Sequence, residues 1–583
     1  MSLSSMSMLM PSVGIWEYFD FARVLMLKTA YAIDSTIDSM RNFQSHNPDL
    51  VATTTSPHFL AIAISLISFL LISPLPEART IEVLFGYGIL NFVYLGSFLM
   101  TQAPTSTIIT YWLLPNITYL TSCLLLTLTR RVFISPLRKF PVPTASAAVS
   151  NYWMAREIGN GTFSRTVREV HRKTGATVVR TGPNEVSVND AEAVVKIYSG
   201  KYQRGSFYEG GKLRGHAAIR ETRSNYHHTI WRRIWDKAFT PGELKHYAAQ
   251  TENATSKLVN SLKKKSGEEV DCTKVMDEFA LDLAAQLTYG EDAGIQDGTG
   301  IKTYLESIKK YLSWLGYYAT LRNLSEMLSY ARDPAVLTTY CSNSESLLIN
   351  RQRHHPDSHD ITSHLLLEDE ESRRKFQVPL QLAANTNLSI LMGTAIGSTL
   401  SQTFQTLSQN KNIQEKLYKE LESHIKSGGD LSTESIKNLP YLSATINESL
   451  RLHNPFSTGV HAAIGEKGLD MGSYHLPAHT QVYVPTLTIM TDEKYFERAD
   501  EFIPERWTEK EEMVKDKRAY IPFGYGVHAC AGKQLAINEL KVVVARVVGG
   551  FVVEGCEDGE EVEWRDYGMV RVGEWKGRFR SRK

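Results

Sequence analysis

A glycine-rich segment that holds a single cysteine constrains the fold more than any other part of this sequence. Residues 523–532 read FGYGVHACAG, and an apolar helical pattern follows directly over 534–548. Because the positive end of a helix dipole stabilises a nearby thiolate, this position should lower the pKa of the Cys530 thiol. The glycines on both sides of the cysteine would let a large flat group approach the backbone beside the sulfur.

A thiolate that binds haem iron needs these features, namely a low-pKa sulfur, a close backbone and amide hydrogens that tune the sulfur. Cys530 is therefore a candidate axial ligand of haem iron. The alternative is a glycine-rich turn around a buried cysteine, the usual environment of an isolated cysteine. We expect that environment for the other four, Cys123, Cys272, Cys341 and Cys556. The odd total and the lack of any CxxC pair favour a reducing compartment.

Three apolar runs distinguish the first part of the chain from the rest. They cover residues 58–73, 81–100 and 107–129. A bilayer span needs about 20 mostly apolar residues, so the runs predict a transmembrane region over 58–130 with one to three spans. The alternative is that one or two of the runs are buried or re-entrant helices.

Basic residues and prolines follow the third run and suggest how the chain is oriented and divided. The cations are Arg130, Arg131, Arg138 and Lys139. By the positive-inside rule this side faces the cytosol, and with three spans the N-terminal segment 1–57 lies in the lumen. Two prolines, Pro141 and Pro143, cannot continue a helix, so we predict a connector over 131–143 and a soluble domain over 144–583.

The soluble part reads as mainly α with small β-sheets. Helical periodicity dominates from 191 to 452 and returns at 534–548, while the alternation over 177–190, broken by Gly-Pro, predicts a hairpin. Residues 476–490 resemble strand and loop, and 358–375 an exposed charged loop. The 583 residues carry 64 Lys and Arg against 63 Asp and Glu, which argues against nucleic acid as the main partner.

The cysteine segment resembles the haem-binding signature of the cytochrome P-450 family, Phe-x-x-Gly-x-[Arg/His]-x-Cys-x-Gly. Phe523, Gly526, His528, Cys530 and Gly532 fill it in register. The resemblance implies a haem b cofactor with Cys530 as proximal iron ligand. It also implies that His528 faces a haem propionate and that Phe523 packs against the ligand loop. The expected architecture is the cytochrome P-450 fold preceded by an N-terminal transmembrane region.

Further motifs follow in the order of the family. NESLRL supplies Glu448 and Arg451, three apart on one helix face, and FIPERW supplies Arg506. The resemblance implies that these three form a buried network on the proximal side of the haem. HTIWRRIWDKAF resembles the helix that gives Arg232, and with it His228, to a propionate. We therefore count all five with the cofactor-binding residues.

The predicted long helix over 378–417 departs from the family pattern. Where the family has an acid and an alcohol that deliver protons to bound dioxygen, this chain has Thr394 and Ala395. Thr399 lies one turn further along, about 6 Å away, and with Thr394 is a candidate catalytic residue. Ser398, a water chain or a substrate hydroxyl are alternatives. The small residues of GTAIG, 393–397, serve either helix packing or room for haem and substrate.

A second departure affects the haem propionates. Fungal relatives often carry arginine where Ala462 stands, and His461 is a candidate to compensate. The segments expected to contact substrate are 208–218, 388–395, 456–461 and 566–570.

The resemblance implies a membrane-anchored monooxygenase of the endoplasmic reticulum with a cytosolic catalytic domain. It would oxidise a hydrophobic fungal secondary metabolite (a terpenoid, polyketide or polyketide–peptide hybrid) with electrons from NADPH through a separate reductase. The variant helix favours oxidation that ends in rearrangement, ring expansion or desaturation. The alternatives are a reductase-independent isomerase or dehydratase that acts on a peroxide, and a non-enzymatic membrane haem protein.

Overall fold

A computed structural model describes most of the chain, and the chain divides into two units after Ile134. The described residues are 57–72, 80–100, 104–291, 293–298, 302–321, 334–354, 359–366, 379–556 and 562–582. The prediction of a lumenal segment over 1–57 lies outside these residues apart from Pro57. The division falls inside the predicted connector 131–143.

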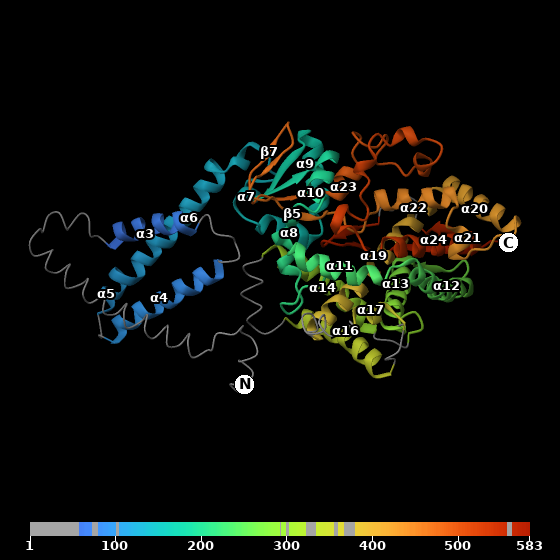
Figure 1. The fold of residues 1–583 in the computed structure, drawn as a ribbon, viewed down its shortest axis with the longest axis horizontal. Helices are drawn as coiled ribbons and strands as arrows, with labels where there is room; N and C mark the ends of the chain where they lie inside the picture. Colours follow the sequence, from blue (N-terminus) through green and yellow to red (C-terminus); the bar gives the residue numbers. More distant parts are fainter. Residues whose placement is uncertain are drawn as a thin grey trace, which may run out of the picture. The chain divides into compact units, whose positions relative to one another are not determined.

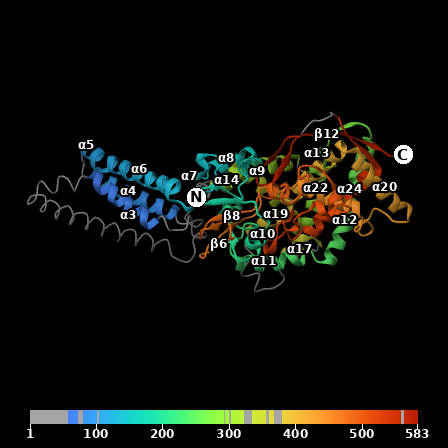
Figure 2. The same cartoon turned by 90° about the horizontal axis from the view of Figure 1, so that it is seen from above.

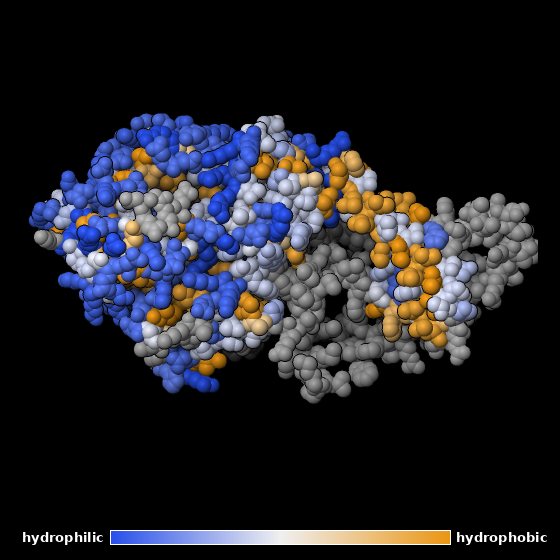
Figure 3. Space-filling view, turned by 180° about the vertical axis from the view of Figure 1, so that it is seen from behind, coloured by the Kyte–Doolittle hydropathy of each residue, from blue (hydrophilic) through white to orange (hydrophobic). Residues whose placement is uncertain are grey.

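The smaller unit consists of apolar helices. They are α3 (Pro57–Ile72), α4 (Thr80–Met100) and a continuous helix from Thr105 to Ile134 that includes α6 (Leu114–Thr129). Among helices whose side chains are described, this last one is long and apolar enough to cross a membrane, while Leu60–Leu70 is a shorter apolar stretch. Figure 3 shows apolar side chains gathered on the outer surface of this unit. The helix runs through Ile134, so residues 131–134 are helical and not part of a connector.

Pro115 is accommodated inside the long helix by a wider turn. Residues Ile109–Leu113 form a π-helical turn, and Pro115 occupies the first turn of α6 directly after it. Proline cannot donate to the carbonyl four residues earlier, that of Tyr111. The Tyr94 hydroxyl donates to that carbonyl instead, at 3.3 Å. A helix with this substitute donor can continue through the proline without leaving the carbonyl unsatisfied.

The larger unit is mostly helical with small sheets, as the periodicity predicts (Figures 1 and 2). Its helices are α7 (Ala145–Val149), α8 (Tyr152–Asn160), α9 (Phe163–Thr174), α10 (Ala191–Tyr198), α11 (Asn225–Lys237), α12 (Pro241–Lys264), α13 (Cys272–Tyr289), α14 (Lys302–Thr320), α16 (Ala335–His354), α17 (Ile361–Leu365), α19 (Pro379–Gln409), α20 (Lys411–Lys426), α21 (Thr433–Ile436), α22 (Pro440–Leu452), α23 (Thr486–Met490) and α24 (Lys533–Gly550).

The strands form four small sheets. They are β1 (Val178–Gly182), β2 (Glu185–Val188), β3 (Gln203–Arg204), β4 (Glu269–Asp271), β5 (His461–Ala463), β6 (Leu469–Asp470), β7 (His475–Leu476), β8 (Gln481–Tyr483), β9 (Phe551–Gly555), β10 (Trp564–Asp566), β11 (Val570–Val572) and β12 (Lys576–Ser581). The largest sheet has the order β1-β2-β8-β5-β3, and only its β2–β8 pair is parallel. β1 and β2 pair antiparallel around a two-residue turn, which confirms the predicted hairpin.

Two coarse predictions need correction. The segment 476–490 does not end as strand or loop, because Thr486–Met490 forms the short buried helix α23. Within the predicted exposed loop 358–375, residues 361–365 form α17, and the N-cap Asp360 is fully buried. The rest of that loop is outside the described residues, apart from 359 and 366.

The long helix α19 runs through the centre of the larger unit, beside α13 (Figure 1). Glycine is required where these two helices touch. A Cβ on Gly393 would lie 2.4 Å from Cβ of Ala284, and a Cβ on Gly397 would lie 2.9 Å from Oδ1 of Asp277. Both glycines therefore serve helix packing, while Gly393 and Ala395 also line the cavity described below, so both alternatives for GTAIG hold. This close approach fixes which face of α19 is left for the site.

Candidate active site

The cysteine segment and α19 face one cavity of about 340 Å³ inside the larger unit. α11 and α13 supply further parts of its wall, which is mainly apolar. Phe523 and Cys530 both line it, and the backbone N–H of Cys530 donates to the carbonyl of Phe523 at 2.9 Å. Cys530 is exposed, and it faces this cavity. The cavity can therefore bring a hydrophobic molecule next to the sulfur.

The ionisation of Cys530 differs from the sequence expectation. Burial raises the pKa of its thiol, although the N–H of Gly532 and the nearby cations Arg232 and Lys533 lower it. The prediction that the helix terminus by itself gives a low pKa is thus wrong for the protein alone, because desolvation outweighs these contributions. A metal ion at the sulfur would supply the missing positive charge, since a coordinating thiol is deprotonated.

The glycines of the cysteine segment do not all serve the cavity. Gly532 lines it, but Gly526 does not. Gly526 has a φ of +68°, and a Cβ there would lie 1.8 Å from the carbonyl oxygen of Tyr198 at the end of α10. The prediction that Gly526 contacts the cofactor therefore needs correction, since Gly526 lets the cysteine loop pack against α10.

Basic side chains gather on one part of the cavity wall. Nδ1 of His528 lies 3.1 Å from Nε2 of His228, and Arg232 of the same helix donates to the carbonyl of Ala529. Arg204 joins them from β3. Burial, and then the positive charge of Arg204, lower the pKa of His228 to about 4 and that of His528 to about 2. Since both imidazoles are then neutral, the positive charge of this part of the wall comes from Arg204 and Arg232, of which Arg232 pairs with Asp236 at 2.7 Å.

Arg204 is a cavity residue that sequence reasoning missed. It lies opposite Ala462 in the β3–β5 ladder, so an arginine on the neighbouring strand stands beside the alanine of the second departure. His461 does not line the cavity, because its ring stacks between Phe207 and Tyr483 at 4.4 and 4.5 Å. No local sequence pattern marks Arg204 in KYQRGSF as a cavity residue, because its position depends on the pairing of β3 with β5.

Glu448 is the centre of a fully buried ion network. Its Oε1 accepts from Nη2 of Arg451, Nε of Arg506 and the N–H of Ile503, at 2.8, 2.9 and 2.9 Å. Its Oε2 accepts from Nε of Arg451 and Nε1 of Trp507, both at 2.9 Å. Both guanidinium groups also donate to backbone carbonyls. One carboxylate therefore ties α22 to the segment of Arg506.

The network does not reach the cavity. None of Glu448, Arg451 and Arg506 lines it, so the prediction that they bind the cofactor needs correction. They are positioning residues, because the segment they fix leads directly to the cysteine loop. Asn454, two residues beyond α22, lines the cavity and donates to the carbonyl of Pro522 at 3.0 Å. This bond links the end of the network's helix to the cysteine loop.

The hydroxyls of α19 divide between two faces. Thr399 lines the cavity, and its Oγ1 donates to the carbonyl of Ala395 at 2.8 Å. Thr394 points elsewhere, toward the carbonyl of Leu391 and Sδ of Met569, and is wrongly placed among catalytic candidates. Ser398 donates to the carbonyl of Val570 and is likewise off the cavity wall. Among these hydroxyls only Thr399 can meet a bound molecule.

The expected substrate segments each contribute to the cavity wall. They do so through Tyr208, Leu388, Met392, Phe456, Thr458 and Gly568. The Thr288 and Ser389 hydroxyls, 2.8 Å apart, add a polar pair to this wall. Such a surface suits a mostly apolar molecule with few polar groups.

The residues present fit a haem. A free sulfur faces the cavity, and the basic wall offers partners for two propionates. Nε2 of His528 and Nε of Arg204 are buried and make no hydrogen bond within the described part of the chain. Buried donors of this kind are normally paired, so an anionic group would satisfy them.

Comparison with known proteins is consistent with this geometry. Residues 149–569 match the family described as Cytochrome P-450. The chain is 30% identical to the cytochrome P-450 monooxygenase nodW of Hypoxylon pulicicidum over 441 residues, 74% of this chain and 80% of the relative. It is 27% identical to the cytochrome P-450 monooxygenase FCK2 of Fusarium pseudograminearum (77% and 83% covered). It is 26% identical to tryprostatin B 6-hydroxylase of Aspergillus fumigatus (77% and 81%).

Proposed function

The chain belongs to the cytochrome P-450 family and is a haem-dependent oxidoreductase, and from this premise we propose that it is a membrane-anchored monooxygenase of fungal secondary metabolism. The observation that carries the proposal is the sulfur of Cys530, which faces an apolar cavity beside a wall that holds Arg204, Arg232 and two histidines. Two of the named relatives are monooxygenases, and the third is a hydroxylase of tryprostatin B.

Bound haem would supply the activation of dioxygen, with two electrons from NADPH through a separate reductase. Cys530 would hold the iron, and a thiolate ligand favours O–O cleavage. His228, Arg232, His528 and Arg204 would hold the propionates. Phe523 and Gly532 would pack around the ligand loop, and the apolar wall would exclude water and bind a hydrophobic substrate.

Thr399 is the residue we assign to proton delivery. Its hydroxyl lies on the cavity wall, where it would hold a proton or a water beside a bound molecule. The acid of the usual pair has no counterpart here, since Thr394 faces Met569. This incomplete pair supports oxidation that ends in rearrangement, ring expansion or desaturation, in which the substrate itself can supply a proton.

We place the enzyme in the endoplasmic reticulum membrane with its catalytic domain in the cytosol. The helix Thr105–Ile134 would serve as an anchor. The cations Arg130, Arg131, Arg138 and Lys139 mark its cytosolic end. The alternative of a non-enzymatic membrane haem protein does not hold, because membership of the family makes the chain an oxidoreductase.

The test is turnover by the purified protein with reductase, NADPH and the intermediates of its pathway. We expect oxygen consumption and a changed substrate, together with a red-shifted Soret band in the reduced, carbon-monoxide-treated protein. Cys530→Ser should abolish both. Retention of that band by Cys530→Ser would refute the assignment of the iron ligand.

A reductase-independent isomerase or dehydratase acting on a peroxide is the second candidate, favoured by the missing acid–alcohol pair. It requires no proton delivery to dioxygen. Turnover of a hydroperoxide without NADPH, combined with no turnover in the complete monooxygenase assay, would decide for it.

A further inference from the structure

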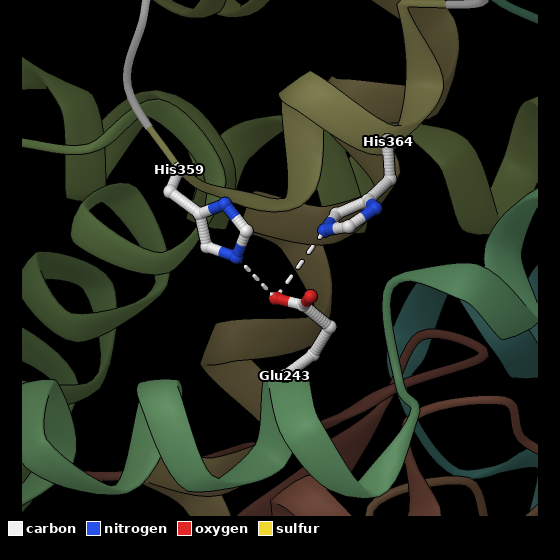
Figure 4. A group of neighbouring side chains, drawn as sticks. All are labelled: Glu243, His359 and His364. Atoms are coloured by element: carbon white, nitrogen blue, oxygen red, sulfur yellow. Dashed lines mark hydrogen bonds and ion pairs between the residues drawn. The ribbon is translucent and has the colours of Figure 1, made fainter.

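Three potential metal ligands meet on the surface of the larger unit, away from the cysteine loop. Glu243 belongs to the first turn of α12, His359 lies two residues before α17, and His364 lies in the last turn of α17. Oε2 of Glu243 is 2.6 Å from Nε2 of His359 and 3.4 Å from Nε2 of His364. All three ligand atoms lie within 4.8 Å of one another. Figure 4 shows both imidazole rings directed at the one carboxylate.

Two imidazoles and one carboxylate form a donor set that Zn²⁺ prefers, with a fourth position left for water. At bond lengths of about 2.0–2.1 Å, tetrahedral geometry places ligand atoms about 3.3 Å apart. The Glu243–His364 separation of 3.4 Å already meets this requirement. The shorter Glu243–His359 contact must open, and the side chain of His359 is 55% exposed and free to move.

The backbone that carries the histidines is held firmly. Asp360 lies next to His359 and is fully buried, where it pairs with Nε and Nη2 of Arg351 at 3.1 and 3.2 Å. Asp360 also caps α17 through a reciprocal pair of hydrogen bonds with Ser363. Ligands on a fixed backbone lose less conformational entropy when they bind a metal.

His364 supplies a second indication of a missing partner. Its Nε2 atom is buried, and the contact with Oε2 of Glu243 at 3.4 Å lacks hydrogen-bond geometry, so no residue that the structure describes hydrogen-bonds to it. Buried imidazole nitrogens are usually hydrogen-bonded or bound to a metal. His246 lies one turn along α12 from Glu243. Its Nε2 is 3.1 Å from the carbonyl oxygen of His359, and this contact helps to position His359.

We propose that Glu243, His359 and His364 bind one divalent transition-metal ion, which joins α12 to α17. Zn²⁺ is the ion that this donor set fits best. The site would act on the catalytic cavity indirectly. Ile361 of α17 lines the cavity, and the hydroxyl of Thr362 donates to the carbonyl of Thr288, another residue of its wall. A metal that fixes α17 thus stabilises one wall of the substrate cavity.

The experiment is a Zn²⁺ titration of the full-length, haem-loaded protein after chelator treatment, in competition with a zinc indicator dye. We expect one saturable equivalent per chain. Affinity should fall at least tenfold in His359→Ala and in Glu243→Gln, because each removes one ligand. His359 is exposed and Glu243 is partly buried, and His364→Gln offers a conservative third variant if one of them folds poorly.

His479→Ala is the matched control. His479 forms an exposed pair with Glu466 at 3.2 Å but has no second histidine beside it, so this variant should bind as wild type does. X-ray absorption at the zinc edge should show two imidazole nitrogens and carboxylate oxygen at about 2.0–2.1 Å. The proposal is overturned if wild type shows no saturable binding, or if the three site variants bind zinc as tightly as His479→Ala.

Discussion

Replacing Glu448 by glutamine tests the claim that one buried carboxylate holds the support of the cysteine loop together. Three donors converge on its Oε1 and two on its Oε2. The amide of glutamine keeps one acceptor oxygen and turns the other into an NH₂ donor. Whichever oxygen is lost, at least two buried donors lose their acceptor, and two guanidinium groups lose their counter-charge.

The expected cost is large for a change of so few atoms. Each unsatisfied buried donor costs about 1–3 kcal/mol, and breaking a buried ion pair costs about 3–5 kcal/mol. The backbone carbonyls that Arg451 and Arg506 also reach keep both guanidinium groups partly satisfied. We therefore expect a loss of about 3–5 kcal/mol, a large part of the roughly 5–15 kcal/mol that stabilises a typical protein.

Guanidinium unfolding of the haem-loaded protein, followed by the Soret band and by far-ultraviolet circular dichroism, measures this loss. The matched control is Glu501→Gln, which breaks an exposed Glu–Arg pair with the same three-residue spacing, to Arg498. Exposed pairs contribute about 0–1 kcal/mol, so the control should unfold almost as wild type does. If Glu448→Gln shifted the midpoint no further than the control, the network would not have the structural role assigned to it.

Three further predictions follow from single positions. Thr399→Ala should lower the product formed per NADPH consumed, and Thr394→Ala should leave this ratio unchanged, because of these two residues only Thr399 lines the cavity. Product and NADPH assays measure the ratio, and a loss in Thr394→Ala but not in Thr399→Ala would contradict the assignment. Gly393→Ala should lower stability by about 1–3 kcal/mol in thermal unfolding, since its Cβ would overlap α13, whereas Gly242→Ala, with nothing within 4 Å, should cost nothing. Burial and the nearby Arg451 lower the pKa of His453 to about 4. Between pH 6.5 and 4 the unfolded chain therefore binds a proton at this residue that the folded chain does not. The free energy of unfolding should fall as the pH drops through this range. In His453→Gln the unfolding midpoint should decline less over this pH range. A decline as steep as that of wild type would contradict the assignment to His453.

Local sequence patterns were sufficient for much of the architecture. The spacing of Glu448 and Arg451 places both on one face of α22, and the alternation around Gly-Pro predicts the β1–β2 hairpin. These patterns depend on contacts within a few residues, which periodicity describes well. The ends of the elements were predicted less accurately, because residues 131–134 are helical and residues 486–490 form the short helix α23.

The sequence by itself determined the chemical identity of this protein: a cysteine in a glycine-rich turn before a helix, together with the motifs that accompany it. Only the tertiary structure decided which groups meet. Helical periodicity gives the spacing of Thr394 and Thr399, but the packing of α19 against α13 decides that Thr399 alone faces the cavity. Arg204 reaches the basic wall through a sheet ladder, and His359 meets Glu243 across 116 positions of chain. Such contacts follow from how whole elements pack, and no local pattern of residues encodes them.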